Sequence, residues 1–322
     1  MIELKKSLAR AWSRIGPRGI YGQSLLAMAK ENEKIFAMSA DLGNSSGLDR
    51  FKNLLPERYL NIGISEQNMI GFSSGLSSCS FNVFVSSFAP FLSLRAGEQV
   101  RMNLAYMKSN VKLVAIGSGI SMGYLGNSHF GLEDISIIRS LPNILIVNPC
   151  DCFEVFKVIQ SLSSYNGPAY IRLTGAAGTP IVHEEDYEFK IGKISLLKEG
   201  NEILIITYGS MCSVALKAAS HLKDENDISV CVVNLHTLRP VDPELKELLK
   251  KFNQIFVVEE HSEIGGLNSI VSNILLKENI RPNNYKCLSL PPKFLSSGTY
   301  EQLLKDYQLT PEKLIKLILE SL

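Results

Sequence analysis

Apolar and polar positions alternate between two periods along the chain, and this alternation predicts a repeated strand–helix order. In the first half, short apolar runs typical of buried strands cover residues 34–39, 59–64, 81–88, 111–117, 144–147 and 169–173. Segments with helical spacing lie between them, at residues 20–32, 48–55, 69–79, 90–107, 132–141 and 152–163. Strands that alternate with helices in this way form a parallel sheet with helices on both faces.

Residues 175–187 interrupt this pattern with Gly, Pro and an acidic cluster, which predicts a domain boundary. The second half then repeats the alternation, with strands expected at 202–208, 228–235, 254–259 and near Leu288, and helices at 214–222, 243–252, 266–276, 299–307 and 310–322. We therefore expect an α/β protein of two domains, residues 1–182 and 183–322. Each is expected to hold a mostly parallel sheet covered by helices on both faces.

Charge and composition argue against nucleic acid and membranes as partners. The 322 residues carry a net charge of +1, so no general field favours nucleic acid or an anionic membrane. The N-terminal segment lacks a signal-peptide core, and no apolar run approaches the length of a membrane span. We expect a cytoplasmic protein with neither nucleic acid nor membrane as a partner.

The six cysteines are scattered and mostly lie in apolar runs, which is typical of buried thiols in a reducing compartment. Cys150 and Cys152 are too close together for the usual zinc-ligand spacing, and no His cluster accompanies them. The sequence therefore predicts no metal-binding residues in this chain. Neither half has a GxGxxG or GxxxxGK[ST] loop, so nucleotide binding of the usual kind is not expected.

One carboxylate stands apart from the other acidic residues. Glu66 lies near the start of the stretch from Gly63 to Arg101, and the next acidic residue is Glu98. It can simply begin the helix expected after it. It can also lie in a dry pocket, where a carboxyl group exchanges a proton with a ligand nitrogen. The hydrophobic pattern leaves both interpretations open.

Seven segments occur in a distinctive order: SADLGNSSGLDRF, RYLNIGISEQNM, SSFAPFLSLRAGEQVR, GNSHFGLEDISIIRSLPNILIVNP, GPAYIRL, TLRPVD and VEEHSEIGGL. The first five together resemble the pyrimidine-binding domain of transketolases and 1-deoxyxylulose-5-phosphate synthases. The last two are similar to the C-terminal domain of the same superfamily. The resemblance covers essentially the whole chain, although each motif alone is weak.

The resemblance implies a site for thiamine diphosphate. In the superfamily, the glutamate matched by Glu66 contacts the N1′ ring nitrogen and favours the imino form, whose exocyclic nitrogen removes the thiazolium C2 proton. Phe88 and Phe91 match aromatic residues that enclose the pyrimidine ring, and Asp41 and Leu42 match a pair on the thiazolium and diphosphate side. From the pattern alone, the two Phe could be core residues and Asp41 a loop cap.

The resemblance also implies a substrate site. His129 matches a histidine that reaches the substrate carbonyl or hydroxyl, whereas an isolated histidine is otherwise usually structural. Arg18 lies where a phosphate-binding arginine is expected. Arg172 lies two or three positions before the place of a second one, where this chain has Thr174 or Gly175.

Other departures concern the aromatic pocket, the substrate and the metal. Leu94 replaces a third aromatic residue, and Leu125 replaces an acidic residue near the loop histidine. No GDG segment, which holds Mg²⁺ and the diphosphate in complete transketolases, occurs in the chain. We therefore expect Mg²⁺ to be held mainly by a separate N-terminal-half subunit, in an α2β2 assembly.

These features predict the C-terminal subunit of a split transketolase, which moves a two-carbon unit from a ketose or 2-oxoacid donor to an aldehyde or sugar acceptor. The missing phosphate and hydroxyl ligands favour an unusual substrate, such as a nucleotide-linked sugar or pyruvate. One alternative is the β-type subunit of the decarboxylase component of a 2-oxoacid dehydrogenase. Another is a non-catalytic scaffold with the same fold.

Overall fold

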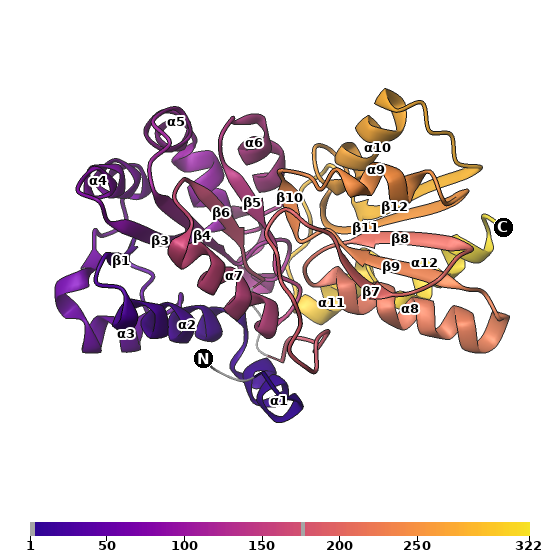
Figure 1. The fold of residues 1–322 in the computed structure, drawn as a ribbon, viewed down its shortest axis with the longest axis horizontal. Helices are drawn as coiled ribbons and strands as arrows, with labels where there is room; N and C mark the ends of the chain where they lie inside the picture. Colours follow the sequence, from indigo (N-terminus) through magenta and orange to yellow (C-terminus); the bar gives the residue numbers. More distant parts are fainter. Residues whose placement is uncertain (1–3, 175–177) are drawn as a thin grey trace.

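Two mostly parallel sheets, one for each half of the chain, form the framework of the molecule (Figure 1). The computed structural model describes residues 4–174 and 178–322. The first sheet contains β1 (Ile35–Ser39), β2 (Tyr59–Asn61), β3 (Asn82–Phe88), β4 (Val111–Ile116), β5 (Leu145–Val147), β6 (Ala169–Arg172) and β10 (Thr237–Arg239). Their order across the sheet is β10-β5-β6-β4-β3-β1-β2, and only β10 runs antiparallel to its neighbour.

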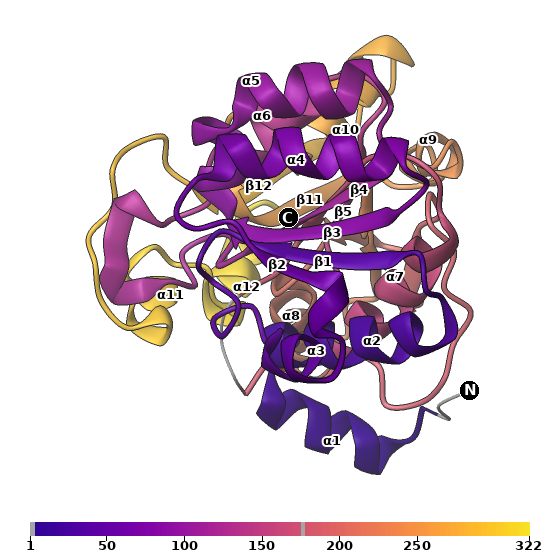
Figure 2. The same ribbon diagram turned by 90° about the vertical axis from the view of Figure 1, so that its left-hand side faces the viewer.

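Helices cover both faces of this sheet (Figure 2). The longer ones are α1 (Lys6–Ile15), α2 (Pro17–Glu31), α3 (Asp49–Leu54), α4 (Glu66–Ser78), α6 (Asp134–Ser140) and α7 (Cys152–Ser164). The segment expected as one helix at 90–107 consists of π-helical turns, Phe91–Arg95 and Val100–Tyr106, around the short α5 (Gly97–Gln99). Helices α4, α5 and α6 lie on one face of the sheet, and α2, α3 and α7 lie on the other.

Short 3₁₀ turns cover Pro56–Arg58 and Gly123–Ser128. The second sheet contains β7 (Ser195–Lys198), β8 (Ile203–Thr207), β9 (Val230–Asn234), β11 (Gln254–Ser262) and β12 (Asn284–Leu290), in the order β12-β11-β8-β9-β7 with β7 antiparallel. Its helices are α8 (Met211–Asn226), α9 (Glu244–Leu249), α10 (Leu267–Lys277), α11 (Tyr300–Asp306) and α12 (Pro311–Leu319). In Figure 1, α9 and α10 lie above this sheet, and α8, α11 and α12 lie below it.

The α/β architecture predicted from the hydrophobic pattern is confirmed in both halves. Apart from the short 3₁₀ turns, three elements in the described part of the chain were not anticipated: α1, β7 and β10. The two strands contain only four and three residues, so they are too short to show a clear two-residue period. Such strands are recognised by their partners in the sheet rather than by their own sequence.

The two halves are joined through β10, which comes from the second half of the chain but pairs with β5 in the first sheet. One hydrophobic cluster also spans both halves, with Ile135 and Ile138 of α6 in the same core as Leu238, Leu267 and Ile270. The division at residues 182 and 183 therefore stays a prediction about the chain, because the packing continues across it. Within the described residues, no helix combines the length and apolar character needed to cross a membrane.

Candidate active site

The parallel strands β1, β2 and β3 end at the same edge of the first sheet. Ser39 at the end of β1 lies opposite Asn61 of β2 on one side and Ser86 of β3 on the other. Segments that follow these strands therefore meet in space, although they are far apart in sequence. The carboxyl edge of an open parallel sheet is where ligands bind in α/β proteins.

Glu66 begins α4 at this edge, and its side chain is only 2% exposed. The carboxylate does not cap the helix. Instead, Oε1 accepts a hydrogen bond from Ser87 Oγ at 3.0 Å, and Oε2 accepts one from Arg95 Nη1 at 2.8 Å. The backbone thus begins a helix, as one interpretation held, and the side chain is buried, as the other requires, while proton exchange with a ligand stays a prediction. A negative charge at a helix N-terminus is further stabilised by the helix dipole.

Three aromatic rings meet beside this carboxylate. The Phe88 and Phe91 centroids are 5.6 Å apart, and the His129 imidazole lies 5.0 Å from Phe88 and 5.2 Å from Phe91. The Arg95 guanidinium stacks on Phe91, 3.8 Å from the ring centroid, and so connects the rings to Glu66. Phe88 is buried, whereas Phe91 and His129 are half-buried. The three rings and the Arg95 guanidinium therefore lie together beside the buried carboxylate.

His129 lies on the loop of residues 117–131. Partial burial and the nearby positive charge of Arg95 lower the pKa of His129, which keeps its imidazole neutral at pH 7. Nδ1 lies 2.9 Å from Ser128 Oγ. A neutral imidazole can donate one hydrogen bond and accept another, which suits contact with a carbonyl or hydroxyl group.

The second half of the chain holds this loop in place. Glu260 Oε1 accepts a hydrogen bond from Ile120 N at 2.9 Å, and a Cβ at Gly119 would lie 2.1 Å from the same oxygen. Asn127 makes a reciprocal pair with the Leu295 backbone, at 2.7 and 2.8 Å. Sequence reasoning missed these anchors. The consecutive acids in the apolar strand VVEEHS were the available signal, because charges in such a run must find buried partners.

Asp41 and Leu42 follow β1 at the same edge. Asp41 is exposed and has a left-handed backbone (φ 59°), and its side chain and amide pair with Asn61 at 3.0 Å. The Leu42 amide donates to Ser39 Oγ at 2.8 Å. This turn leaves the Asp41 carboxylate facing solvent beside the strand ends.

Arg18 lies at the start of α2, next to the loop that follows Asp41. A Cβ at Gly47 would lie 2.4 Å from the Arg18 carbonyl oxygen, so Gly47, with φ of 75°, is needed for this close packing. The Arg18 side chain is half-buried, and desolvation lowers its pKa. Among the described residues, no hydrogen bond or ion pair joins this guanidinium to the aromatic cluster.

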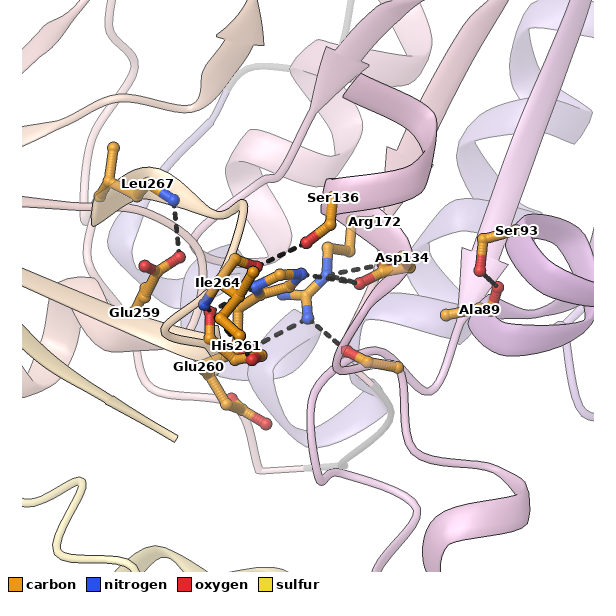
Figure 3. A network of polar contacts seen from close by, with 12 residues as sticks. Ala89, Ser93, Asp134, Ser136, Arg172, Glu259, Glu260, His261, Ile264 and Leu267 are labelled. Atoms are coloured by element: carbon orange, nitrogen blue, oxygen red, sulfur yellow. Dashed lines mark hydrogen bonds and ion pairs between the residues drawn. The ribbon is translucent and has the colours of Figure 1, made fainter. Parts of the chain in front are cut away.

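The substrate-binding role expected of Arg172 does not fit this structure. Its side chain is 1% exposed, and Nε contacts both oxygens of Asp134 at 2.9 and 3.2 Å (Figure 3). Nη2 donates to the carbonyls of Gly131 and Glu260, at 2.8 and 3.0 Å. The guanidinium is thus bound to internal groups that join the two halves. Of the two positions where the second arginine was expected, Thr174 is buried and Gly175 lies outside the described residues.

The edge formed by Glu66, Phe88, Phe91 and His129 fits the aminopyrimidine part of thiamine diphosphate. A ring nitrogen needs a buried carboxyl partner, and a flat ring needs aromatic walls, and both are present. Within residues 4–174 and 178–322, the only grouping of three potential metal ligands is Cys150, Asp151 and His183. Cys150 and Asp151 of this grouping follow β5. In the sheet, β6 and β4 lie between β5 and β3, so the grouping is separate from the edge that carries Glu66 and Phe88.

Two family models match the chain: the pyrimidine-binding domain of transketolase at residues 14–178, and the transketolase C-terminal domain at residues 192–314. The chain belongs to the transketolase family. Within this family, it is 38% identical over 309 residues to a putative transketolase C-terminal section of Methanocaldococcus jannaschii, covering 95% of this chain and 96% of that protein.

It is also 33% identical to an apulose-4-phosphate transketolase subunit of Phocaeicola vulgatus, over 95% of this chain and 97% of that subunit. The solved structure of a split-gene transketolase, described as an inactive β4 tetramer, matches with a TM-score of 0.86 and 34% identity. That match covers 95% of this chain and 98% of the solved chain. The transketolase resemblance inferred from the ordered motifs is therefore confirmed.

Proposed function

We propose that this chain is the C-terminal subunit of a split, thiamine-diphosphate-dependent transketolase that transfers two-carbon units. The observation that carries this proposal is Glu66, a buried carboxylate whose two oxygens point at Ser87 and Arg95, beside the rings of Phe91 and His129. Thiamine diphosphate, when bound, supplies the electron sink for carbon–carbon bond cleavage and formation. The chain supplies the walls and the proton partner for its pyrimidine ring.

Glu66 holds or releases a proton at Oε2, while Ser87 fixes the orientation of Oε1. For Oε2 to meet a ring nitrogen, Arg95 has to withdraw. The Arg95 side chain is 44% exposed and stacks on the Phe91 ring, so it can turn to solvent at little cost in free energy. Phe88 and Phe91 exclude water from this carboxyl group and thereby strengthen its hydrogen bond to a ligand.

His129 and Arg18 are proposed to contact the substrate. His129 Nδ1 is next to Ser128 Oγ, so Nε2 is the atom that would reach a substrate carbonyl or hydroxyl. Arg18 would bind a substrate phosphate, and Asp41 with Leu42 would border the thiazolium and diphosphate. Leu125 and the missing second arginine, where this chain has Thr174 or Gly175, support a substrate other than an ordinary pentose phosphate.

The names of relatives support the split architecture and the uncommon substrate. One relative is named for apulose 4-phosphate, and another, from Clostridium sp. and 34% identical, is a 6-deoxy-6-sulfo-D-fructose transketolase subunit. The β4 tetramer of the solved split-gene transketolase is described as inactive. We propose that this chain likewise needs an N-terminal-half subunit, which would hold Mg²⁺ and the diphosphate in an α2β2 assembly.

The surface next to the site fits such a partner. Ile64, Phe72, Leu94 and Tyr106 lie on or beside α4 and the π-helical segment, with exposed fractions of 78%, 46%, 56% and 74%. Large apolar side chains exposed along neighbouring segments mark protein interfaces. Burial of these side chains would place the partner against the segments that carry Glu66 and Arg95.

Reconstitution with the partner subunit tests the proposal. The complex should transfer two-carbon units in the presence of thiamine diphosphate and Mg²⁺, and Glu66→Gln should lower kcat by roughly 10²–10⁴-fold. Glu98→Gln removes a carboxylate that is 61% exposed and should leave activity unchanged. Full activity of the Glu66→Gln complex would contradict the mechanism. Robust turnover of xylulose 5-phosphate with ribose 5-phosphate would contradict the unusual substrate.

A further inference from the structure

Three side chains of types that can bind a metal ion converge at the junction between the first domain and the segment that follows it. Cys150 and Asp151 lie at the start of α7, and His183 lies more than thirty positions later. The ligand atoms lie within 4.8 Å of one another. Cys150 and Asp151 are buried and His183 is half-buried, so this is not an exposed cluster of acidic groups.

Two of the three spacings between these atoms match those of a tetrahedral zinc site. Zinc binds sulfur at about 2.3 Å, imidazole nitrogen at about 2.1 Å and carboxylate oxygen at about 2.0 Å, so tetrahedral angles place S and N about 3.6 Å apart and N and O about 3.3 Å apart. In the structure, Cys150 Sγ is 3.8 Å from His183 Nδ1, and Asp151 Oδ2 is 3.3 Å from the same nitrogen. A bound ion would take the place of the direct contacts that His183 Nδ1 makes with Cys150 Sγ and Asp151 Oδ2.

Neighbouring groups already fix the orientation of two of the ligands. Asp151 Oδ1 accepts the hydrogen bond of Glu154 N, and Oδ2 accepts those of Val182 N and His183 N at 3.0 and 2.7 Å. The His183 ring stacks on Tyr187 with centroids 3.9 Å apart. Hydrogen bonds and packing of this kind orient ligands in protein metal sites.

The charge around the cluster also favours a cation. Asp151 and Glu154 are both buried, at 4% and 0% exposure. Among the described residues, Asp151 forms an ion pair only with His183, and Glu154 accepts hydrogen bonds from Cys150 N, Tyr187 and Asn234 without any ion pair. A divalent cation would offset two of the three negative charges carried by the two carboxylates and a Cys150 thiolate.

We propose that Cys150 Sγ, Asp151 Oδ2 and His183 Nδ1 bind one Zn²⁺ ion and thereby fasten the interdomain segment to the first domain. Binding releases the thiol proton of Cys150 and any proton on Nδ1 to solvent, while the carboxylate binds as it stands. A cavity of about 10 Å³ borders Asp151 and His183 and has room for a water as fourth ligand. The mixed N, O and S ligand set favours zinc over Mg²⁺ or Ca²⁺.

Zinc analysis of the purified full-length chain tests this site without reference to catalysis. The chain is loaded with Zn²⁺ under reducing conditions, because the Cys212 thiol next to Cys150 could otherwise form a disulfide. Gel filtration and elemental analysis should then find one zinc per chain. Cys150→Ser and His183→Gln should each weaken binding by at least about 100-fold, more than the loss of an outer partner causes.

Matched controls separate this site from adventitious binding. Cys79→Ser and His221→Gln change an exposed thiol and an exposed imidazole and should retain the zinc. The Co²⁺-loaded chain should show a thiolate-to-cobalt absorption band that Cys150→Ser removes. Circular dichroism checks that the variants fold. If Cys150→Ser does not fold, the loss of zinc from His183→Gln tests the site instead. A zinc-free wild type, equal affinity in the His183→Gln chain, or no thiolate band would overturn the proposal.

Discussion

Glu66 and Arg95 form an ion pair in which one partner is buried and the other faces solvent. Arg95 Nη1 lies 2.8 Å from Glu66 Oε2, and the arginine and glutamate side chains are 44% and 2% exposed. The sheet fixes the carboxylate through Ser87, whereas the guanidinium is held mainly by the Phe91 ring. Arg95 is therefore the movable partner, and its charge acts on both Glu66 and His129.

The titration of His129 should reveal this charge. Partial burial and then Arg95 lower its pKa below the ordinary value of about 6.5, so we expect a lowered value by NMR and a partial return toward 6.5 in Arg95→Gln. The folded state favours the neutral form of His129, and this preference affects the free energy of unfolding. The stability that His129 contributes is present above pH 6.5 and is lost as the pH falls through 6.5 toward the lowered pKa. An unchanged His129 titration in Arg95→Gln would contradict the electrostatic coupling.

Phe88 and Phe91 should differ in what their removal costs. Phe88 is 6% exposed within β3, so Phe88→Ala should lower the free energy of unfolding by about 3–5 kcal/mol. Phe91 is half-buried, so Phe91→Ala should cost roughly 1 kcal/mol. In the complex, Phe91→Ala should weaken thiamine diphosphate binding about 2- to 10-fold. Urea unfolding and cofactor titration measure the two effects, and equal unfolding costs would contradict the assignment.

Arg172 should prove to be a stabilising residue rather than a phosphate ligand. Arg172→Met leaves the buried carboxylate of Asp134 without its cation and should lower the free energy of unfolding by about 3–5 kcal/mol. Arg101→Met, which breaks an exposed pair with Glu98, should cost at most about 1 kcal/mol. If Arg172→Met instead unfolds like the wild type and raises KM for a phosphorylated substrate, the substrate role expected from the sequence is correct.

Glu260 should control the mobility of the His129 loop. Its carboxylate accepts from Ile120 N, Ser210 and Tyr300, so Glu260→Ala should speed hydrogen exchange of the Ile120 amide by about 10- to 100-fold. Glu259→Ala is the matched control. Glu259 accepts from the amide of Leu267 at the start of α10, so its loss should speed exchange there and leave Ile120 protected. The opposite pattern would show that the loop does not depend on Glu260.

Much of the candidate site follows from local patterns in the sequence. The strand–helix alternation predicts parallel strands, and parallel strands bring their carboxyl ends to one edge. Segments that end or follow β2 and β3 must therefore meet, which is why Glu66, Phe88 and Phe91 lie together as the ordered motifs indicated. His129 joins them on a loop, whose path the motif order alone did not describe.

Other features depend on partners that are distant in sequence. Periodicity shows that a residue is buried but not which group it meets, so it could not show that Arg172 binds Asp134, or that Glu260 anchors the loop of His129. The cysteine spacing near Cys150 predicted no metal site, because His183 is far along the chain.

The sequence by itself therefore determined the order of strands and helices, the transketolase family and the residues at the strand ends, because these depend on local spacing and on motif order. Only the tertiary structure decided the crossing of β10 into the first sheet, the internal role of Arg172 and the meeting of Cys150, Asp151 and His183. Each of these is a contact between distant segments, and its geometry is set by packing of the whole chain.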